Sequence, residues 1–355
     1  MIMANKSKLT LIVDGNWLLM SRLAVISGRY PDMNELNREL KLLMIRSINL
    51  VLRTFPVIDN IIFVADGGSW RNTEVTIPMF LQDDGIEYKG NREHSDDIDW
   101  DIIFSGYEDF LNILKDNGVT VSKEKMIEGD DWCWWWSTYL NSQGTNVIIW
   151  SKDRDLTQLV NIDNNGCFTV CWNKDGGITC MDKDEDDFNL LFNNELSEND
   201  RLFQALVNKS IGVNKINPKE ICIDKIVRGD LGDNIQPIIV KKSKNENSTR
   251  IYRVSQKDID NSLNIFDEDK VRTYIDKLCE SKSYKNRVND RTPYEIFEHF
   301  IYNRRLVVLN EKSYPENVLS ILQSHTDYNV CKDLSEVEHI IAAQRSELTD
   351  ILELI

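Results

Sequence analysis

The sequence predicts an α/β fold with a mainly parallel central sheet flanked by helices. In the first half of the chain, short apolar runs alternate with segments that have helical spacing, and strand signals become rare after about residue 190. Strands that are apolar throughout are typical of parallel sheets, whose two faces are both covered by helices. The length of 355 residues suggests two domains at the usual size of about 100–200 residues each.

The elements of the first half are expected in alternating order. Strands are expected at residues 9–13, 61–65, 119–122 and 146–151, followed by a terminal hairpin formed by 167–172 and 178–181. Helices are expected at 34–54, where apolar residues recur at helical spacing, at 108–116, which Gly118 ends, and at 130–140.

The second half is expected to form a mostly helical domain, with a boundary near residue 190. Asn, Lys and Glu become more frequent there, and Pro237 with the polar stretch 241–249 indicates an exposed loop. Helices are expected at 199–207, 220–228, 267–278, 293–308 and from 334 to the end.

The charge balance is acidic, with 42 Lys and Arg against 58 Asp and Glu, a net charge of −16 and a pI of about 4.8. A hydrophobic content of 41% excludes a collagen or a wholly disordered chain. The acidity argues against a surface coated in basic charge. It does not exclude nucleic-acid binding, which depends on local basic patches.

Targeting and redox signals point to a cytoplasmic protein without a membrane segment. The apolar run 9–13 is broken by Asp14, so it is shorter than the apolar part of a signal peptide, and no window approaches the ~18 apolar residues of a membrane-spanning helix. The seven cysteines are scattered, without a CxxC pair or a zinc-like Cys/His cluster, so we expect reduced thiols.

Acidic residues come directly after several predicted strands. Asp14 follows the first strand, Asp66 the second, and Asp153 the strand at 146–151, with Asp155 two residues later. Glu128, Asp130 and Asp131 follow the short strand and begin a helix. Because the carboxyl ends of parallel strands lie at one edge of a sheet, we expect these side chains to converge there.

Carboxylates that converge in this way repel one another unless a cation neutralises them. Mg²⁺ and Mn²⁺ prefer oxygen ligands, and two ions ~3.5–4 Å apart suit phosphodiester hydrolysis. Taken singly, an Asp after a strand is usually a turn or helix-capping residue. The prediction of a metal site therefore rests on their joint occurrence. By contrast, the acidic run 182–187 is interpreted as a solvated loop.

Six short motifs occur in an order that we recognise from a known family. They are DGN at 14–16, AD at 65–66, YKGNR at 88–92, EGDD at 128–131, SKDRD at 151–155 and GDLGDN at 229–234. Over about residues 9–240 the chain resembles the flap-endonuclease and 5′-nuclease family, and it looks most like phage ribonuclease H and phage 5′-exonucleases.

The resemblance implies a PIN/5′-nuclease-like catalytic domain at residues 1–190, with an arch segment at about 70–107. It implies a duplex-binding domain at 191–355 that contributes Asp230 and Asp233. The first of two Mg²⁺ ions, for which Mn²⁺ would be able to substitute, would be held by Asp14, Asp66, Glu128 and Asp130, with Asp131 close by. The second would be held by Asp153, Asp155, Asp230 and Asp233, partly through water.

The implied catalytic residues are Asp14, Asp66, Asp130 and Asp153 together with two cations of the arch, Lys89 and Arg92. These cations would grip the scissile phosphate, and Tyr88 and Arg71 would also contact nucleic acid. Lys89 and Arg92 stand among ten acidic residues in the segment 83–109. From the residues alone, without the resemblance, both would be interpreted as solvated surface charges on a loop.

A duplex contact is expected after GDLGDN, where residues 235–253 hold five basic residues against one glutamate. Most relatives have a glycine-rich helix–hairpin–helix turn at this place, but this segment reads QPIIVKKSKNEN. We therefore expect the side chains of Lys241, Lys242 and Lys244 to contact phosphates instead of backbone amides.

The implied function is that of a Mg²⁺-dependent 5′→3′ exonuclease or flap endonuclease of the ribonuclease H type. It would act on 5′ ends or flaps of DNA and RNA–DNA duplexes in phage DNA replication, as a monomer in the host cytoplasm, with a replication single-strand-binding protein as a partner. Three alternatives remain: a non-catalytic binder of nucleic-acid structures on the same scaffold, a single-strand-specific ribonuclease, and an aspartyl phosphohydrolase. The last is expected to have a DxD motif, whereas Asp14 is followed by Gly15 and Asn16.

The tryptophans at 132, 134, 135 and 136 are predicted to pack in the core rather than to stack on bases, because they lie on the helix that follows EGDD. No Walker or dinucleotide-binding glycine motif is present.

Overall fold

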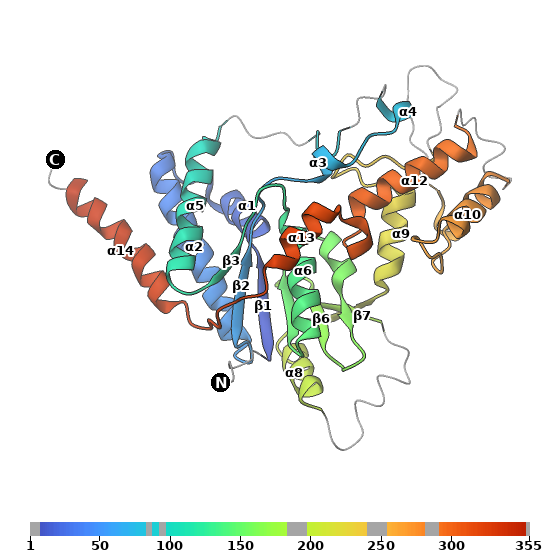
Figure 1. Ribbon diagram of the computed structural model, residues 1–355. Helices are drawn as coiled ribbons and strands as arrows, with labels where there is room; N and C mark the ends of the chain where they lie inside the picture. Colours follow the sequence, from blue (N-terminus) through green and yellow to red (C-terminus); the bar gives the residue numbers. More distant parts are fainter. Residues whose placement is uncertain are drawn as a thin grey trace. The chain divides into compact units, whose positions relative to one another are not determined.

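The structure is a computed structural model that describes residues 8–82, 87–91, 97–182, 197–239, 254–280 and 291–352. Contacts divide the chain into two compact units (Figure 1). The first comprises residues 1–68, 94–216 and 322–355, and the second comprises 69–93 and 217–321. Each unit therefore combines segments that are distant in sequence, and this grouping differs from a single boundary near residue 190.

The first unit contains one eight-stranded sheet with the order β3-β2-β1-β4-β6-β7-β8 and with β5 beside β6. All pairs are parallel except β5–β6 and β6–β7, so the expected mainly parallel sheet is confirmed. The strands are β1 (Leu9–Asp14), β2 (Asn60–Val64), β3 (Thr120–Ser122), β4 (Asn146–Trp150), β5 (Asn161–Ile162), β6 (Phe168–Asn173), β7 (Gly177–Met181) and β8 (Val213–Ile216).

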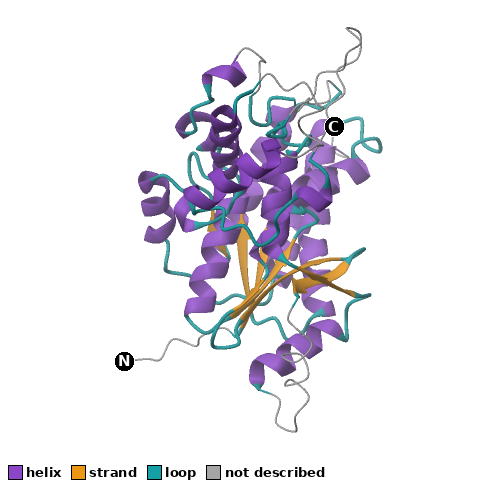
Figure 2. Cartoon of the chain, turned by 90° about the vertical axis from the view of Figure 1, so that its right-hand side faces the viewer, coloured by secondary structure: helices purple, strands orange, loops and turns teal. Residues whose placement is uncertain are grey.

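Helices cover both faces of this sheet (Figure 2). Helices α1 (Gly15–Ile26), α2 (Met33–Thr54) and α5 (Trp100–Asp116) pack together, and their apolar side chains form one core with alternate residues of β1, namely Leu9, Leu11 and Val13. Helix α6 (Gly129–Ser142) contacts β1, β2, β4 and β6. Because side chains alternate along a strand, both faces of each central strand are apolar.

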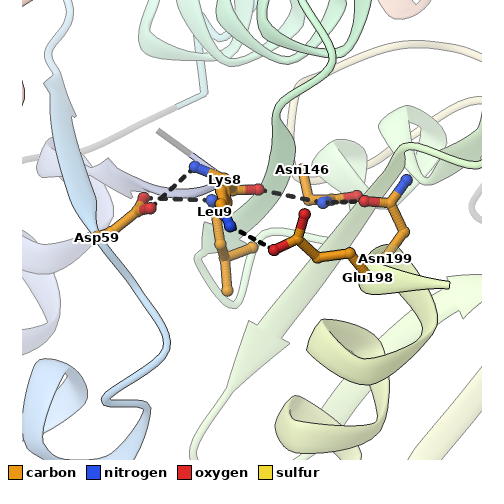
Figure 3. Close-up of polar contacts among 6 residues, drawn as sticks. All are labelled: Lys8, Leu9, Asp59, Asn146, Glu198 and Asn199. Atoms are coloured by element: carbon orange, nitrogen blue, oxygen red, sulfur yellow. Dashed lines mark hydrogen bonds and ion pairs between the residues drawn. The ribbon is translucent and has the colours of Figure 1, made fainter. Parts of the chain in front are cut away.

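The amino ends of β1 and β4 are fastened by polar contacts (Figure 3). Asp59 accepts hydrogen bonds from the backbone N–H groups of Lys8 and Leu9, at 2.9 and 3.2 Å. The Asn146 amide donates to the Lys8 carbonyl at 3.1 Å, and Lys8 also pairs with Glu198 of α8 (Glu198–Val207). These contacts stabilise the sheet at the amino ends of its strands, whereas the acidic candidates follow the carboxyl ends.

The C-terminal segment belongs to the first unit. Helix α14 (Ser335–Leu352) packs on α2, where Glu338 accepts hydrogen bonds from Arg46 Nε and Asn49 Nδ2 at 3.1 and 2.7 Å. Before this helix, the Asn329 N–H donates to Thr120 Oγ1 on the edge strand β3, at 2.9 Å. The end of the chain therefore contacts both a helix layer and the sheet edge.

The second unit is helical. It contains α9 (Pro218–Arg228), α10 (Glu268–Glu280), α12 (Pro293–Val307) and most of α13 (Glu316–Ser324), with short helices α3 (Arg71–Glu74), α4 (Met79–Gln82), η3 (Gln256–Asp258) and η4 (Glu311–Ser313). Helix α12 packs on α9 and α10. Its buried Asn303 donates to the carbonyls of Ile226 and Gln236, at 2.9 and 2.8 Å, so α12 holds both sides of the loop between them.

The expected helices of the second half coincide closely with α8, α9, α10, α12 and α14. The described residues of the first unit also include the short helix η1 (Asp155–Leu159). Among the described helices, none combines the length and the apolar character that a membrane span requires.

Candidate active site

The candidate site lies where the neighbouring parallel strands β2, β1 and β4 end. Asp14 is the last residue of β1, Asp66 lies two residues beyond β2, and Asp153 lies three residues beyond β4. Glu128 immediately precedes α6, the helix that packs against these strands. The sheet order and the parallel pairing place these strand ends at one edge.

Asp14 is buried at this edge, with 6% of its surface exposed. Its Oδ1 accepts the Trp17 N–H at 3.0 Å and so caps α1, while its Oδ2 accepts the Ser151 hydroxyl at 2.7 Å. Burial is the largest cause that raises the pKa of Asp14, the charges of Asp66 and Asp153 add to it, and the two hydrogen bonds lower it, so that the pKa stands at about 7. The charges of Asp66 and Asp153 therefore both act on the carboxylate of Asp14.

Asp66 is connected to both neighbouring elements. Its backbone N–H donates to Asn16 Oδ1 at 3.1 Å, and its Oδ1 accepts the Gly129 N–H at 2.5 Å. Asn16 Oδ1 also accepts from the Tyr107 hydroxyl at 3.3 Å. Because Gly129 is the first residue of α6, its N–H has no partner within the helix, and the carboxylate of Asp66 supplies one.

The acidic residues around the start of α6 have divided roles. Glu128 and Asp131 form a capping box, in which Asp131 Oδ2 accepts the Glu128 N–H at 3.0 Å. Asp131 is fully buried, whereas Asp130, on the first turn of the helix, is half-buried. Asp131 is therefore engaged in forming the helix terminus, and Asp130 is the more accessible of the pair.

Beyond β4, Ser151 joins two acidic residues. Its Oγ donates to Asp14 and accepts the Asp153 N–H at 2.9 Å. Asp153 Oδ1 in turn accepts the N–H of Asp155, the first residue of η1, at 2.8 Å. The motif SKDRD thus forms a turn at the end of β4, in which the backbone of Asp155 is bonded to the side chain of Asp153.

The two remaining acidic candidates, Asp230 and Asp233, belong to the second compact unit. Asp230 Oδ2 pairs with Lys225 Nζ at 2.6 Å, and its Oδ1 accepts the Gly232 N–H at 2.8 Å. Burial alone would raise the pKa of Asp230, but these contacts hold it below its usual value. The carboxylate is therefore kept ionised.

Lys89 lies in this same unit, next to the GDLGDN loop. Its backbone N–H donates to the Asp233 carbonyl at 2.9 Å, and its Nζ lies 4.9 Å from the centre of the Tyr88 ring. Arg92, Lys241, Lys242 and Lys244 lie outside the residues that the structure describes.

Arg71, which we expected to contact nucleic acid, is buried, with 3% of its surface exposed. Its Nε donates to the Leu306 carbonyl at the end of α12 at 2.9 Å, and its guanidinium lies 4.6 Å from the Trp70 ring centre. A phosphate contact needs an accessible guanidinium. The structure instead gives Arg71 a packing role within the second unit.

Several residues of the candidate site were not singled out in the sequence. Ser151, Asn16 and Tyr107 connect the carboxylates through hydrogen bonds. A group of cations also surrounds Asp175, in the turn after β6: Lys152 pairs with it, and Lys174 and Arg22 lower the pKa of its carboxyl group. Of these residues, Ser151 and Lys152 could have been found in the sequence, because both are part of the motif SKDRD.

The tryptophans of α6 are core residues, as predicted. Trp132 and Trp136 are fully buried or nearly so, and Trp134 and Trp135 are also buried. The Trp136 indole N–H donates to Ser122 Oγ at 2.7 Å, and that of Trp135 donates to the His325 carbonyl at 2.7 Å. These contacts use the polar edges of the rings inside the protein.

The donor set of the strand ends has the chemistry of a site for a hard divalent cation. All of its candidates are carboxylate oxygens, and the raised pKa of Asp14 records a buried negative charge that a cation would offset. Among the described residues, no three His, Cys, Asp or Glu side chains are already gathered as a ligand set. The residue types fit Mg²⁺ or Mn²⁺, and binding would have to draw the side chains together.

Comparison with known proteins identifies the fold. No protein-family model matches the chain, and no curated protein does. Among solved structures, the 5′-exonuclease of bacteriophage T5 with bound zinc ions is similar, with a TM-score of 0.53 and 16% identity over 90% of this chain and 98% of that one. The bacteriophage T5 flap endonuclease in a pseudo-enzyme–product complex with DNA and metal ions has a TM-score of 0.51, with the same identity and coverage. The expected 5′-nuclease-like fold is thereby confirmed.

Proposed function

We propose that this chain, which has the fold of a phage 5′-exonuclease, is a divalent-metal-dependent 5′ nuclease. It would hydrolyse phosphodiesters at 5′ ends or flaps of DNA and RNA–DNA duplexes. The observation that carries the proposal is that the charges of Asp66 and Asp153 act on the carboxylate of Asp14, at the ends of three adjacent parallel strands. A buried carboxylate next to two others is unfavourable without a counter-charge, and such a cost is typical of functional sites.

Under this proposal, Asp14, Asp66, Glu128 and Asp130 hold the first of two Mg²⁺ ions, with Asp131 close by. The second ion is held by Asp153, Asp155, Asp230 and Asp233, partly through water. When bound, the ions would lower the pKa of a water molecule and stabilise the leaving oxygen. Ser151 and the Trp17 N–H orient the two oxygens of Asp14, and the Gly129 N–H orients Asp66. These contacts orient the individual carboxylates, and metal binding would bring the ligand set together.

The substrate would be held by cations. Lys89 and Arg92 would bind the scissile phosphate, and Lys241, Lys242 and Lys244 would bind duplex backbone. Lys152 and Lys174 belong to the cation group after β4 and β6, the strand ends that share the edge with the candidate site. An acidic chain needs such local basic groups to approach DNA.

The proposed biological role is the removal of primers or flaps in phage DNA replication, by a monomer in the host cytoplasm. A replication single-strand-binding protein is the proposed partner. This role requires cleavage of both RNA–DNA and DNA duplexes from the 5′ end.

The test uses nicked, 5′-flapped and single-stranded substrates carrying a fluorophore near the 5′ end, incubated with Mg²⁺ or with EDTA. We expect short 5′-phosphorylated products from the nicked and flapped duplexes with Mg²⁺ alone. Asp153→Asn should abolish cleavage, whereas Asp109→Asn, at an exposed position of α5, should not. Cleavage of single strands only would favour the ribonuclease alternative, and structure-specific binding without cleavage would favour the non-catalytic one.

A further inference from the structure

Three hydrogen bonds join two segments of the second unit that lie about 140 residues apart in sequence. The Lys89 N–H donates to the Asp233 carbonyl, the Asn234 side-chain amide donates to the Glu87 carbonyl, and the Asn91 side-chain amide donates to the Leu231 carbonyl. Each bond is 2.9 Å long. We call this set of bonds, between residues 87–91 and 231–234, the loop clamp.

Both segments of the loop clamp have constrained backbones. Lys89 and Asn234 adopt left-handed conformations, with φ of 58° and 56°, which are uncommon for residues other than glycine. The Gly90 N–H closes the first turn by donating to the Glu87 carbonyl at 3.0 Å. Such backbone strain persists only where the surrounding contacts determine it, and the loop clamp provides these contacts.

The GDLGDN loop is itself fixed to the helices of its unit. Asp230 and Ile235 exchange two backbone hydrogen bonds, of 2.8 and 2.7 Å, which close the loop at its base. Asn303 of α12 holds the chain on both sides, through the carbonyls of Ile226 and Gln236. The loop is thus closed at its base and bonded to α12, and the segment around Lys89 is attached to it through the loop clamp.

We propose that Asn91 and Asn234 are positioning residues that fix the backbone of Lys89 so that its ammonium group meets the scissile phosphate. The inference rests on the proposed nuclease function, and it extends it to two residues that do not touch the substrate. A cation stabilises developing charge best when it is already in place, because no reorganisation is then required during the reaction. The left-handed backbone at Lys89 sets the direction in which its side chain leaves the chain.

The exposure of the two asparagines allows an effect on the position of Lys89 to be distinguished from an effect on folding. Asn91 is exposed and Asn234 is half-buried, and each donates to a backbone carbonyl of a loop instead of filling the core. Substitution at either position therefore leaves no cavity in the hydrophobic core, and chemical unfolding of each variant measures any change in stability. A large loss of activity at either position would therefore point to the placement of Lys89.

The first test is Asn234→Asp, which keeps the side-chain shape and tolerates the left-handed backbone, but removes the amide donor. We expect the single-turnover rate on a 5′-flap substrate to fall about 10- to 100-fold, with substrate affinity changed less than about threefold. Hydrogen exchange at the Lys89 amide should become faster. Asn310→Asp is the matched control, because Asn310 accepts through Oδ1 from the Lys312 N–H and an aspartate can do the same.

The deciding test is a double-mutant cycle with Lys89→Ala. If Asn234 acts through Lys89, the rate of Lys89→Ala with Asn234→Asp should equal that of Lys89→Ala alone. If the rate losses of the two single variants multiply in the double variant, the positioning role is overturned. It is also overturned if hydrogen exchange at the Lys89 amide is the same in Asn234→Asp as in wild type. A wild-type chain that cleaves no substrate would instead overturn the proposed function, while the exchange measurement would still report on the loop clamp.

Discussion

The hydroxyl of Ser151 donates a 2.7 Å hydrogen bond to Oδ2 of Asp14, joining the ends of the neighbouring strands β4 and β1. The hydroxyl oxygen of Ser151 also accepts the Asp153 N–H, at 2.9 Å. One small side chain therefore connects two proposed metal ligands. It also stabilises the ionised form of Asp14, against a burial that raises its pKa to about 7.

Replacing Ser151 with alanine should shift the pH dependence of cleavage. Without the hydroxyl, nothing at this position offsets burial, so the pKa of Asp14 should rise further and the acidic limb of the rate profile should move to higher pH. Single-turnover rates measured between about pH 5.5 and 9 check this. Ser137→Ala is the control, because this buried serine donates only to the Trp134 carbonyl on α6. Coincident acidic limbs in wild type and Ser151→Ala would contradict the assigned role.

Asp14→Asn should stabilise the metal-free protein at neutral pH. The folded pKa of about 7 lies above the ordinary value of 3.8, so the folded chain holds an extra proton between these values and loses stability as the pH rises through them. The variant lacks this loss, and above pH 7 it should be more stable by up to about 4 kcal/mol. Urea unfolding in EDTA at several pH values measures the difference. Parallel stability curves for the two proteins would count against a strained buried charge.

Gly129→Ala should damage the site more than the fold. A Cβ at Gly129 would lie 3.0 Å from Asp66 Oδ1, the same oxygen that accepts the Gly129 N–H. Displacing this carboxylate should reduce cleavage about 10-fold or more, by analogy with other small displacements of catalytic groups. Gly28→Ala is the matched control, because a Cβ at Gly28 would have no other atom within 4 Å. Equal activities of the two variants would show that the position of Asp66 is not critical.

Trp136→Phe should lower stability without changing catalysis by the folded protein. The substitution removes the buried hydrogen bond to Ser122 Oγ and leaves that hydroxyl without this donor, at a cost of about 1–3 kcal/mol. Chemical unfolding and single-turnover cleavage together separate packing from base stacking. Weakened substrate binding with unchanged unfolding would mean that the ring serves nucleic acid instead of the core.

The strands of the sheet could be predicted because their own residues determine them. The strand expected at 146–151 contains the apolar run Val147–Trp150, and β4 occupies Asn146–Trp150. Helix α1 was missed, because Gly15 and Asn16 after the first strand resemble a turn and the apolar residues that follow do not form a single stripe. Strand β8 was missed because Val213–Ile216 is mostly exposed, and it extends the sheet beyond the hairpin expected to terminate it.

The sequence predicts those parts of the candidate site in which an acidic residue directly follows a strand. The positions of Asp14, Asp66 and Asp153 after strands follow from the apolar runs before them. The bond from Asn234 to the Glu87 carbonyl depends on a partner 147 residues away, which no local pattern encodes. The burial of Arg71 likewise depends on the end of α12, far along the chain.

The central claim is that the strand-end carboxylates form a site for a divalent cation that acts in cleavage. Calorimetric titration of the DNA-free protein with Mn²⁺ tests this most directly, using wild type, Asp66→Asn, Asp153→Asn and the exposed control Asp109→Asn. We expect wild type and the control to bind Mn²⁺ equally and to cleave a 5′-flap, and the other two variants to lose both properties together. Undiminished Mn²⁺ binding in Asp66→Asn and Asp153→Asn, or flap cleavage that persists in EDTA, would contradict the account.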